Sequence, residues 1–449
     1  MKSDGVLILS HCGFSFAEDL VAACHARGLD AWILTSKPLP EHGASRLAAL
    51  QGMVEELFVT DAHELSTRDV ENAIASLRGR GFCIKGCISV WEGYRALMAY
   101  GNALQGVADL PWDRVEQLRD KLHVRLTLKD AGLTNVSAQT LTPAVLEALK
   151  HDRGAYFVKP VRGIASYGAF RLTQETTWSA LEAVASQAQK DTVYTSVLGT
   201  QLTFMAEEYI SGTEFSFEVL AVAGTPFVVG IHEKCQLTEG DGTVLENSCT
   251  SPPSSLTGDQ IAAGLSWIAS VLTCLKLDWG CFHIEARFDG YRWGLIEVNP
   301  RVGGSLISRS VLALNGTASL LDLWLDQLVF QSDGKPSPDY IRAVAELSYS
   351  KEGVAPTDEA TFFRVYFASP GRIESIQVEP TEPAPVLTQV LLKEGDEIEP
   401  AAREVFIGQI LWHMPREQRD RDLTRLLASS ATAIAVRYQA AEPRKDSRA

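Results

Sequence analysis

The sequence predicts an α/β domain at the N-terminus, an α+β region in the middle and a β-rich domain at the C-terminus. Three observations support this order. Strand and helix patterns alternate through the first hundred residues, which is typical of a parallel sheet. Pairs of strands with glycine turns follow in the middle, and strand patterns prevail towards the end. We therefore expect three domains, at 1–108, 109–330 and 331–449.

The N-terminal domain reads as alternating strands and helices. Its strand patterns lie at 5–10, 30–36 and 83–90, and its helix patterns lie at 17–28 and 91–106. A glycine after the first strand, Gly13, is weak evidence for a phosphate loop. Because this region has no GxGxxG motif and no acidic residue placed for a dinucleotide ribose, we do not expect a Rossmann cofactor site.

Helices frame the central region. Three helix patterns lie at 110–133, 257–276 and 305–330. We expect a break in the last of them near Asn315-Gly316, because glycine commonly ends a helix. Residues 331–338, QSDGKPSP, read as a linker to the C-terminal domain, which ends in a further helix.

The composition limits the classes of partner. The chain has 449 residues, 46% of them hydrophobic, which is enough for several cores. Its net charge of −15 argues against nucleic acid or anionic membranes as general partners, because both attract basic surfaces. An anionic small molecule stays open as a ligand, since it needs only a local cluster of donors.

Nothing in the chain predicts secretion or membrane insertion. The apolar stretch at the N-terminus is too short for a secretory signal, and no apolar run reaches the ~18 residues of a membrane helix. The eight cysteines are scattered without a CxxC pair, which favours buried thiols in a reducing compartment. We expect a soluble, cytoplasmic protein.

A hairpin in the middle of the chain carries two opposed carboxylates. Residues 281–301 read CFHIEARFDGYRWGLIEVNPR, two strand patterns around the turn DGYR at 289–292. A hairpin centred on this turn sets Glu285 opposite or nearly opposite Glu297, with Cβ atoms about 5 Å apart. Like charges at that distance repel each other, so the pair needs an explanation.

Strand alternation divides the side chains of this hairpin between a polar face and a core face. The polar face would take His283, Glu285 and Arg287 from the first strand, with Leu295, Glu297 and Asn299 from the second. The core face would take Phe282, Ile284 and Ala286, with Ile296 and Val298.

A bound cation would explain the opposed glutamates. Two carboxylates and the amide of Asn299 form an all-oxygen donor set, which suits Mg²⁺ completed by phosphate oxygens of a substrate. A cation between Glu285 and Glu297 would remove their repulsion. Arg301, in the turn that follows, lies within reach of an oxyanion or phosphate on the same metal. The plainer alternative is a solvated strand face with ordinary acidic residues.

Two further segments supply groups suited to a nucleotide. FVKPVRGIASYGAF, at 157–170, places Lys159 at the end of a strand before a loop of glycines and serine. Backbone N–H groups of such a loop can approach phosphates, with the lysine as a point charge. AEEYISGTEFSFEV, at 206–219, places three glutamates around a serine-glycine turn, and reads either as an acidic β-turn or as an adenosine clamp.

Taken in order, four segments resemble those of the ATP-grasp superfamily. They are RDKLHVRL around Lys121, VKP with its glycine loop, EEYISGTEF, and HIEARF followed by LIEVNPRVGG. The resemblance covers 118–304. It implies an α/β N-terminal domain followed by an α+β ATP-grasp fold and a β-rich C-terminal domain. It also implies ATP and Mg²⁺ as cofactors, for which Mn²⁺ can substitute.

The resemblance implies roles for individual residues. The ATP phosphates would contact Lys121 and Lys159, with Ser166 in the mobile loop. The adenine would face Glu207, Tyr209 and Ile210, and the ribose hydroxyls would face Glu214. The Mg²⁺ ligands would be Glu285, Glu297 and Asn299. Catalysis, by stabilising the transferring phosphoryl group or the tetrahedral intermediate, would rest on Arg301 and Lys159.

Within the superfamily, the chain resembles the L-amino acid ligases of the bacilysin synthetase type. Lys234, Glu246 and Pro252-Pro253 match that group's pattern of a lysine, a later glutamate and a proline-serine. This implies a substrate site at Lys234 and Glu246. It also implies amide formation between an acid, activated as an acylphosphate, and an amine, both amino acids or similar, with release of ADP and phosphate. A homodimer would be ordinary for such enzymes.

Three alternatives stay open. The chain could be an ATP-grasp carboxylase, a ligase with another acceptor, or a non-catalytic nucleotide-binding module. It has no MKM motif for biotin attachment, which weakens only one form of the carboxylase. All proposed metal ligands and the arginine are present, which argues against the module.

Two residues have two interpretations each. His283 shares the metal face and could serve as a base or contact the substrate, whereas a lone strand histidine is more often structural. Arg309, in the helix after the Asn-Pro-Arg turn, could bind a substrate carboxylate, whereas a surface or capping arginine is the commoner case.

Overall fold

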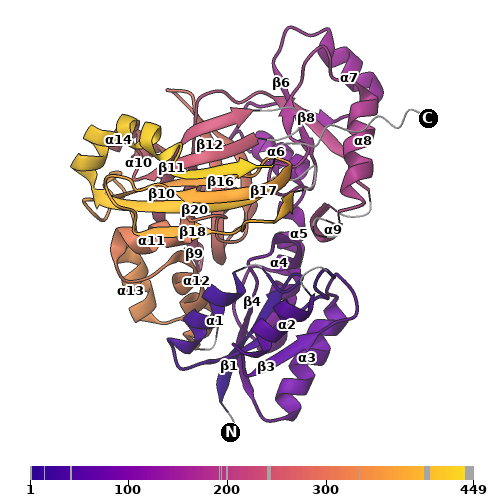
Figure 1. The fold of residues 1–449 in the computed structure, drawn as a ribbon, viewed down its shortest axis with the longest axis vertical. Coiled ribbons are helices and arrows are strands. Elements are labelled where there is room, and N and C mark those ends of the chain that lie inside the picture. Colours follow the sequence, from indigo (N-terminus) through magenta and orange to yellow (C-terminus); the bar gives the residue numbers. More distant parts are fainter. Residues whose placement is uncertain are drawn as a thin grey trace.

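The computed structural model describes residues 3–14, 16–40, 43–191, 193, 195–198, 201–239, 244–332, 334–398 and 405–439. Its N-terminal domain, at the bottom of Figure 1, is built on a parallel sheet of order β3-β2-β1-β4. The strands are β1 (Asp4–Ser10), β2 (Asp30–Thr35), β3 (Glu56–Val59) and β4 (Cys83–Ile88). The helices are α1 (Ala17–His25), α2 (Gly43–Gln51), α3 (Thr67–Gly79) and α4 (Arg95–Gln105), the last preceded by the 3₁₀ turn η1 (Glu92–Tyr94). The α/β prediction for this region is confirmed.

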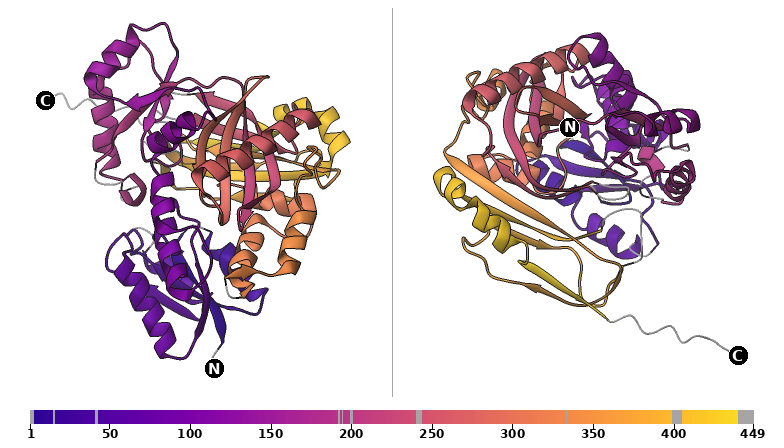
Figure 2. Two further views of the ribbon diagram at one scale, coloured as in Figure 1. Left: turned by 180° about the vertical axis from the view of Figure 1, so that it is seen from behind. Right: turned by 90° about the horizontal axis from the view of Figure 1, so that it is seen from above.

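A smaller lobe projects beside the rest of the molecule (Figures 1 and 2). Its antiparallel sheet has the order β5-β8-β6-β7. The strands are β5 (Ala138–Thr140), β6 (Tyr156–Pro160), β7 (Phe170–Arg171) and β8 (Phe204–Glu208). The helices are α7 (Pro143–Lys150), α8 (Trp178–Ala188) and α9 (Thr195–Leu198).

Two helices, rather than the single one expected over 110–133, connect the N-terminal domain to this lobe. They are α5 (Trp112–Leu118) and α6 (Lys121–Asp130). The chain breaks between them because the Asp120 side chain accepts the His123 N–H at 2.8 Å and caps the second helix. Lys121 therefore stands at the first position of α6.

A large antiparallel sheet of order β13-β12-β9-β10-β11-β16-β20-β18 joins the central and C-terminal regions. Its central strands are β9 (Thr213–Val222), β10 (Thr225–Glu239), β11 (Val244–Ser251), β12 (Gly280–Phe288) and β13 (Trp293–Asn299). Its C-terminal strands are β16 (Glu359–Phe367), β18 (Leu387–Val390) and β20 (Phe406–Pro415). Because β11 pairs with β16, the sheet runs across the domain boundary that we predict at 330–331.

Helices cover both faces of the large sheet. On one face, α10 (Gly258–Leu275) packs with α5 and α6 over apolar side chains such as Phe217 and Ile284. On the other face, α11 (Ile307–Asn315) and α12 (Leu320–Val329) continue the core into the N-terminal sheet. The break predicted near Asn315-Gly316 is confirmed, since Gly316 has φ +68° and separates these two helices.

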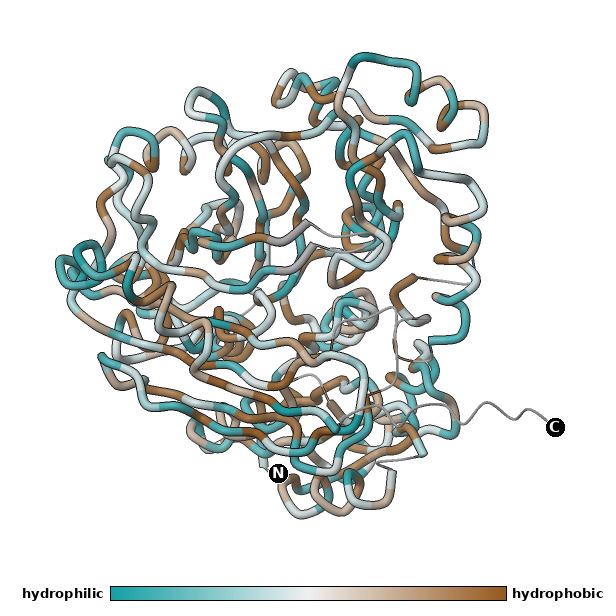
Figure 3. Tube along the Cα trace, turned by 45° about the horizontal axis from the view of Figure 1, so that its top comes forward, coloured by the Kyte–Doolittle hydropathy of each residue, from teal (hydrophilic) through white to brown (hydrophobic). Residues whose placement is uncertain are grey.

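The predicted linker is followed by the remaining elements. Short strands β14 (Gln331–Ser332) and β15 (Lys335–Pro336) occupy it, with residue 333 outside the described residues. After them come α13 (Pro338–Glu346), β17 (Gly371–Val378), β19 (Glu397–Ile398), α14 (Arg416–Ser430) and β21 (Ile434–Tyr438). Hydrophobic segments follow the strands in the interior, and hydrophilic ones gather at the outer turns (Figure 3). Among the described residues, no helix has both the length and the apolar character needed to cross a membrane.

Candidate active site

The hairpin of β12 and β13 has the register that its sequence predicts. The turn lies at 289–292, where the Asp289 N–H donates to the Arg292 carbonyl at 3.2 Å. Glu285 pairs directly with Glu297 across the two strands, two positions nearer to the turn than the His283–Asn299 pair. The two carboxylates therefore stand opposite each other.

The expected alternation on β13 is wrong at one position. The register shifts between Glu285 and Ala286, so that Ala286 pairs with Leu295 and Ile296 becomes an extra residue. Leu295, expected on the polar face, is 1% exposed and packs in the core, whereas Ile296 lines the cavity beside Glu297. A bulge inserts one residue into a strand and so reverses the alternation beyond it.

An amide and a lysine hold Glu297. The Asn299 side chain donates to Oε1 at 2.9 Å, and Lys121 Nζ lies 3.2 Å from Oε2. Lys121 also donates to the Gly163 carbonyl at 3.2 Å. Burial alone would raise the pKa of Glu297, but the charge of Lys121 holds that pKa below its usual value. The carboxylate is therefore ionised, as a metal ligand must be.

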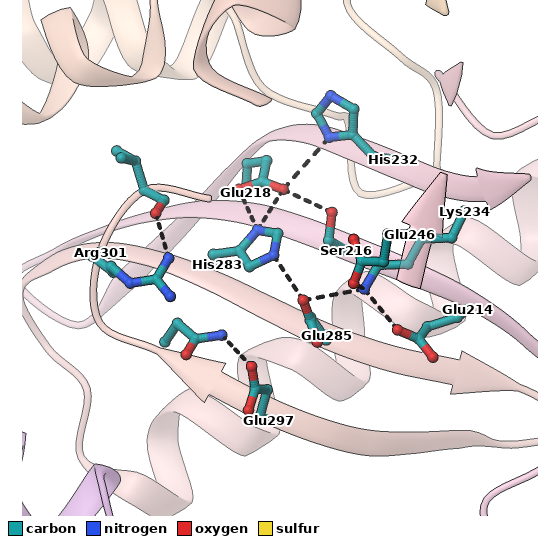
Figure 4. A network of polar contacts seen from close by, with 12 residues as sticks. Glu214, Ser216, Glu218, His232, Lys234, Glu246, His283, Glu285, Glu297 and Arg301 are labelled. Atoms are coloured by element: carbon teal, nitrogen blue, oxygen red, sulfur yellow. Dashed lines mark hydrogen bonds and ion pairs between the residues drawn. The ribbon is translucent and has the colours of Figure 1, made fainter. Parts of the chain in front are cut away.

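Glu285 shares a buried lysine with two other glutamates (Figure 4). Lys234 Nζ lies 2.6 Å from Glu214 Oε1 and 3.1 Å from Glu285 Oε1, and it also pairs with Glu246. The nearest oxygens of the three glutamates lie within 4.8 Å of one another. Burial by itself would lower the pKa of Lys234, but the surrounding carboxylates hold it well above its usual value. Burial raises the pKa of Glu246 to about 7.

Besides Lys234, Glu285 Oε1 contacts a histidine on the same strand. His283 Nε2 lies 3.1 Å from Glu285 Oε1, and Nδ1 lies 2.9 Å from Oε1 of Glu218 on β9. Burial alone would lower the pKa of His283, but the charge of Glu218 raises it to about 10. This histidine is thus a cation between two carboxylates.

A second buried ion-pair cluster lies at the ends of β6 and β8. Lys159 Nζ lies 2.7 Å from Glu207 Oε1 and donates to the Ile296 carbonyl at 3.1 Å. Arg125 Nε donates to the other oxygen of Glu207 at 2.8 Å. Burial lowers the pKa of Lys159. Both carboxylate oxygens of Glu207 have partners, so this side chain holds Lys159 in place. The contact of Glu207 with adenine stays a prediction.

Arg287 organises the end of the site where the nucleoside is expected. Its Nε donates to Glu214 Oε2 at 2.8 Å, and its Nη1 donates to the Ile210 carbonyl at 2.9 Å. The guanidinium carbon lies 5.3 Å from the centre of the Tyr209 ring, within the range of a cation–π contact. Glu214 is therefore held between Arg287 and Lys234.

These side chains converge on one cavity between the smaller lobe and the large sheet, which is open to solvent. Its lining includes the predicted residues Lys121, Lys159, Ser166, Glu207, Tyr209, Ile210, Glu214, Glu246, Glu285 and Glu297. On the lobe side, the loop between β6 and β7 lines the cavity. It is strongly curved, with φ +51° at Ala165, +54° at Ser166 and +68° at Gly168. Asn299, Lys234 and His283 lie behind the lining and contact it through Glu297 and Glu285.

The two predicted arginines lie in different places. Arg301 Nη2 lies 2.9 Å from Glu92 Oε2 of the N-terminal domain, and its Nη1 donates to the Val302 carbonyl at 2.9 Å. Arg309 pairs with Asp19 on α1. Neither arginine belongs to the lining of the cavity, although Arg301 lies near Glu297 in Figure 4.

Sequence reasoning missed three charged residues of this site: Glu92, Arg125 and Glu218. Arg125 lies four residues after Lys121, which puts both on one face of α6, so helical spacing could have found it. Glu218 lies four residues after Glu214 on β9 and shares its face, so strand alternation could have found it. Glu92 had no such signal, because its partner is far away in the sequence.

Comparison with known proteins identifies the domain that carries the site. Residues 155–309 match the family model described as the ATP-grasp domain. The chain contains an ATP-grasp domain. No curated protein matches the chain in sequence.

Solved structures with an ATP-grasp-like fold match the whole chain. The L-amino acid ligase from Bacillus licheniformis has a TM-score of 0.71 at 19% identity, covering 98% of this chain and 99% of that one. Phosphoribosylglycinamide synthetase from Anaerococcus prevotii has a TM-score of 0.65 at 13% identity, covering 97% and 100%. The biotin carboxylase domain of 2-oxoglutarate carboxylase from Hydrogenobacter thermophilus, in complex with MgADP, ADP and bicarbonate, has a TM-score of 0.67 at 15% identity, covering 97% and 91%. At these identities the likeness establishes the fold.

ATP-grasp enzymes use ATP with Mg²⁺, and the residues of this cavity fit both. Opposed Glu285 and Glu297 supply carboxylate oxygens, and Asn299 can supply an amide oxygen, which is the donor set that Mg²⁺ prefers. Lys121 and Lys159 supply positive charge to the same lining, where they could bind phosphates. The site thus has complementary charge for a nucleotide and its cation.

Proposed function

We propose that the protein is an ATP- and Mg²⁺-dependent carboxylate–amine ligase. The observation that carries this proposal is the convergence of two opposed glutamates and two lysines on one cavity of an ATP-grasp domain. The similarity in fold to an L-amino acid ligase over nearly the full length of both chains supports the choice of reaction.

The reaction has two steps. A carboxylate oxygen of the acid attacks the γ-phosphorus of ATP, the bond to the β-phosphate oxygen breaks, and an acylphosphate and ADP form. The amine nitrogen then attacks the acyl carbon, the bond to the phosphate oxygen breaks, and the amide forms. For an ammonium substrate, one proton is released and one leaves with the phosphate.

The chain contributes mainly position and charge, because ATP and the acid are both anionic. Lys121 and Lys159 would bind phosphate oxygens, and Glu285, Glu297 and Asn299 would hold Mg²⁺. The ion would supply positive charge to offset the negative charge of the phosphates. Arg301 stabilises the transferring phosphoryl group or the tetrahedral intermediate, and the buried Glu92 fixes its guanidinium.

The acid and the amine are amino acids or close analogues in this proposal. Glu246 lines the cavity beyond the metal-side glutamates, so it stands where an ammonium group of a substrate can approach. Lys234 neutralises that region and keeps Glu214 and Glu285 in place. A small peptide would then be the product.

A carboxylase is the second candidate. The biotin carboxylase domain with bicarbonate has a fold similarity comparable to that of the ligase, with TM-scores of 0.67 and 0.71. In that case bicarbonate would take the place of the acid, and the same lysines and glutamates would serve ATP.

One experiment separates the candidates. Phosphate and ADP release from ATP with Mg²⁺ is measured with single amino acids, with pairs of them, and with bicarbonate, and products are identified by mass spectrometry. Release that requires an amino acid pair, with a product mass equal to the pair less one water, supports the ligase. Release with bicarbonate but no pair supports the carboxylase. Turnover in neither arm, with Glu297→Ala binding ATP and Mg²⁺ like the parent, contradicts the assignment of this site.

A further inference from the structure

A fully buried carboxylate lies behind the metal-side hairpin. Glu218 on β9 is 0% exposed, and it does not line the cavity. A buried carboxylate is costly unless charged or hydrogen-bonding groups surround it. Ser216 Oγ donates to its Oε1 at 2.8 Å, and His283 Nδ1 lies 2.9 Å and 3.0 Å from its two oxygens.

A second histidine lies near the same carboxylate without a hydrogen bond to it. His232 Nδ1 lies 3.5 Å from Glu218 Oε1, and its Nε2 lies 2.9 Å from Ser310 Oγ on α11. Ser310 in turn shares a hydrogen bond of 2.7 Å with Thr361 on β16. Glu218 therefore lies in a row of polar side chains that runs from α11, β16 and β10 towards β12. Figure 4 shows the part of this row from His232 through Glu218 and His283 to Glu285.

The chain of contacts ends on one oxygen of Glu285. His283 Nε2 and Lys234 Nζ both reach Oε1, each at 3.1 Å. In the described part of the chain, Oε2 of Glu285 has no hydrogen-bond donor from the protein. The arrangement fixes the carboxylate through one oxygen and leaves the other for a cation.

We propose that Glu218 is a positioning residue of the metal site, which acts through His283 to orient Glu285. The proposal rests on the proposed function, since it takes Glu285 as a Mg²⁺ ligand. Partners behind a metal ligand typically change metal affinity or activity by about 10- to 100-fold when they are removed. Without Glu218 the imidazole has one anchor instead of two, and the orientation of Glu285 is less well defined.

The test measures Mn²⁺ binding in the presence of ADP. The amount of free Mn²⁺ is read from its electron paramagnetic resonance signal. We expect Glu218→Gln, which keeps the size but removes the charge, to weaken Mn²⁺ binding by about tenfold or more. ADP binding without metal should stay unchanged. Glu233→Gln is the matched control: Glu233 is 8% exposed, accepts the Ser254 and Ser255 N–H groups, and lies outside the chain of contacts.

A double-mutant cycle tests the route. If Glu218 acts through His283, then His283→Asn weakens Mn²⁺ binding and adding Glu218→Gln weakens it little further. Full additivity would overturn the route through His283. Parent-like Mn²⁺ binding by Glu218→Gln would overturn the proposal.

Two further arms keep the result interpretable. Glu218→Asp keeps the charge but draws the carboxylate back from His283 by one methylene, so it should also weaken binding. If Glu218→Gln does not fold, parent-like binding by Glu218→Asp overturns the proposal instead. If the parent protein binds no Mn²⁺ with ADP, the proposed function itself fails, which is a different result from a parent that binds and variants that bind equally well.

Discussion

Three acidic side chains of the site have cationic partners that lower their pKa values. Glu297 has Lys121, Glu207 has Lys159 and Arg125, and Glu285 has Lys234 and His283. This local pairing keeps the carboxylates ionised although the chain carries a net charge of −15. At the residue scale, the site is therefore a set of oriented charges, each held by a charge of opposite sign.

Glu297→Gln tests the metal side. The amide keeps the size of the side chain but removes the negative charge opposite Glu285. We expect the rate of ATP-dependent phosphate release to fall by about 10²-fold or more, as at other preorganised charged sites. Glu208→Gln is the control, because Glu208 is exposed and accepts the Ser137 N–H outside the cavity lining. Equal rates for both variants would contradict the metal role of Glu297.

Lys159→Met tests the phosphate side. Arg125 still compensates Glu207 in this variant, so we expect the protein to fold. The loss of a charged hydrogen bond to phosphate, about 1.5–3 kcal/mol, should raise KM for ATP by roughly 10- to 100-fold. Initial rates over a range of ATP concentrations measure this change. Lys129→Met, at an exposed position on α6, should leave KM unchanged.

At the scale of elements, turns and a bulge decide which side chains enter the cavity. The bulge at Ile296 turns Glu297 towards Glu285 and places a carbonyl against Lys159. The turn between β8 and β9 contains Tyr209, Ile210 and Gly212, and it lies against the end of β12, where Arg287 donates to the Ile210 carbonyl. Gly212 in this turn has φ +108°. A Cβ on Gly212 would lie 2.2 Å from the Phe288 carbonyl oxygen, so this turn packs directly on the end of β12.

Gly212→Ala should therefore be more harmful than an alanine at another turn glycine. Gly290 has φ +98° but open space around its Cβ position, so Gly290→Ala should lose about 1–2 kcal/mol from the unfavourable φ alone. Gly212→Ala adds a backbone clash, and overpacking costs roughly 1–3 kcal/mol more. Urea unfolding of the two variants compares these losses directly. Similar losses would mean that the turn can shift away from β12 at little cost.

At the scale of the whole molecule, the N-terminal domain reaches the ATP-grasp domain through ion pairs. Arg301 pairs with Glu92, Arg27 with Asp322 and Asp326, and Arg309 with Asp19. The first pair includes Arg301, which lies near Glu297 in Figure 4. Glu92 is 5% exposed, so its carboxylate holds the arginine in a buried, defined position.

Glu92→Gln should reduce kcat without changing KM for ATP. The guanidinium of Arg301 loses its charged partner, and a small displacement of a catalytic group can cost up to about 10²-fold in rate. Steady-state rates with the substrates found by the product screen measure both constants. Asp326→Asn removes another bridge between the same two parts of the molecule, and it should leave kcat unchanged. A parallel loss in both variants would point to domain docking rather than to Arg301.

Much of the fold and the closeness of Glu285 and Glu297 followed from local sequence signals. The turn at 289–292 and strand alternation, both of which are short-range properties, were enough to place the two glutamates opposite or nearly opposite each other, and the bulge at Ile296 makes them a direct pair. The division of 305–330 at Gly316 followed from the helix-ending preference of glycine. The order of the segments with Lys121, Lys159 and the hairpin was enough to identify the ATP-grasp region.

Tertiary structure decided the partners of these residues. Lys234 meets glutamates from three other strands, and Glu92 reaches Arg301 across 209 positions of the sequence. Such pairs result from strand order and domain packing, which periodicity along one strand does not contain. The bulge at Ile296 likewise depends on how β13 pairs with β12, so alternation alone placed Leu295 on the wrong face. The sequence by itself thus indicated the segments whose charged side chains line the cavity. The packing of distant segments determined which charge holds which, and it added Glu92, Arg125 and Glu218, because their partners lie on other elements.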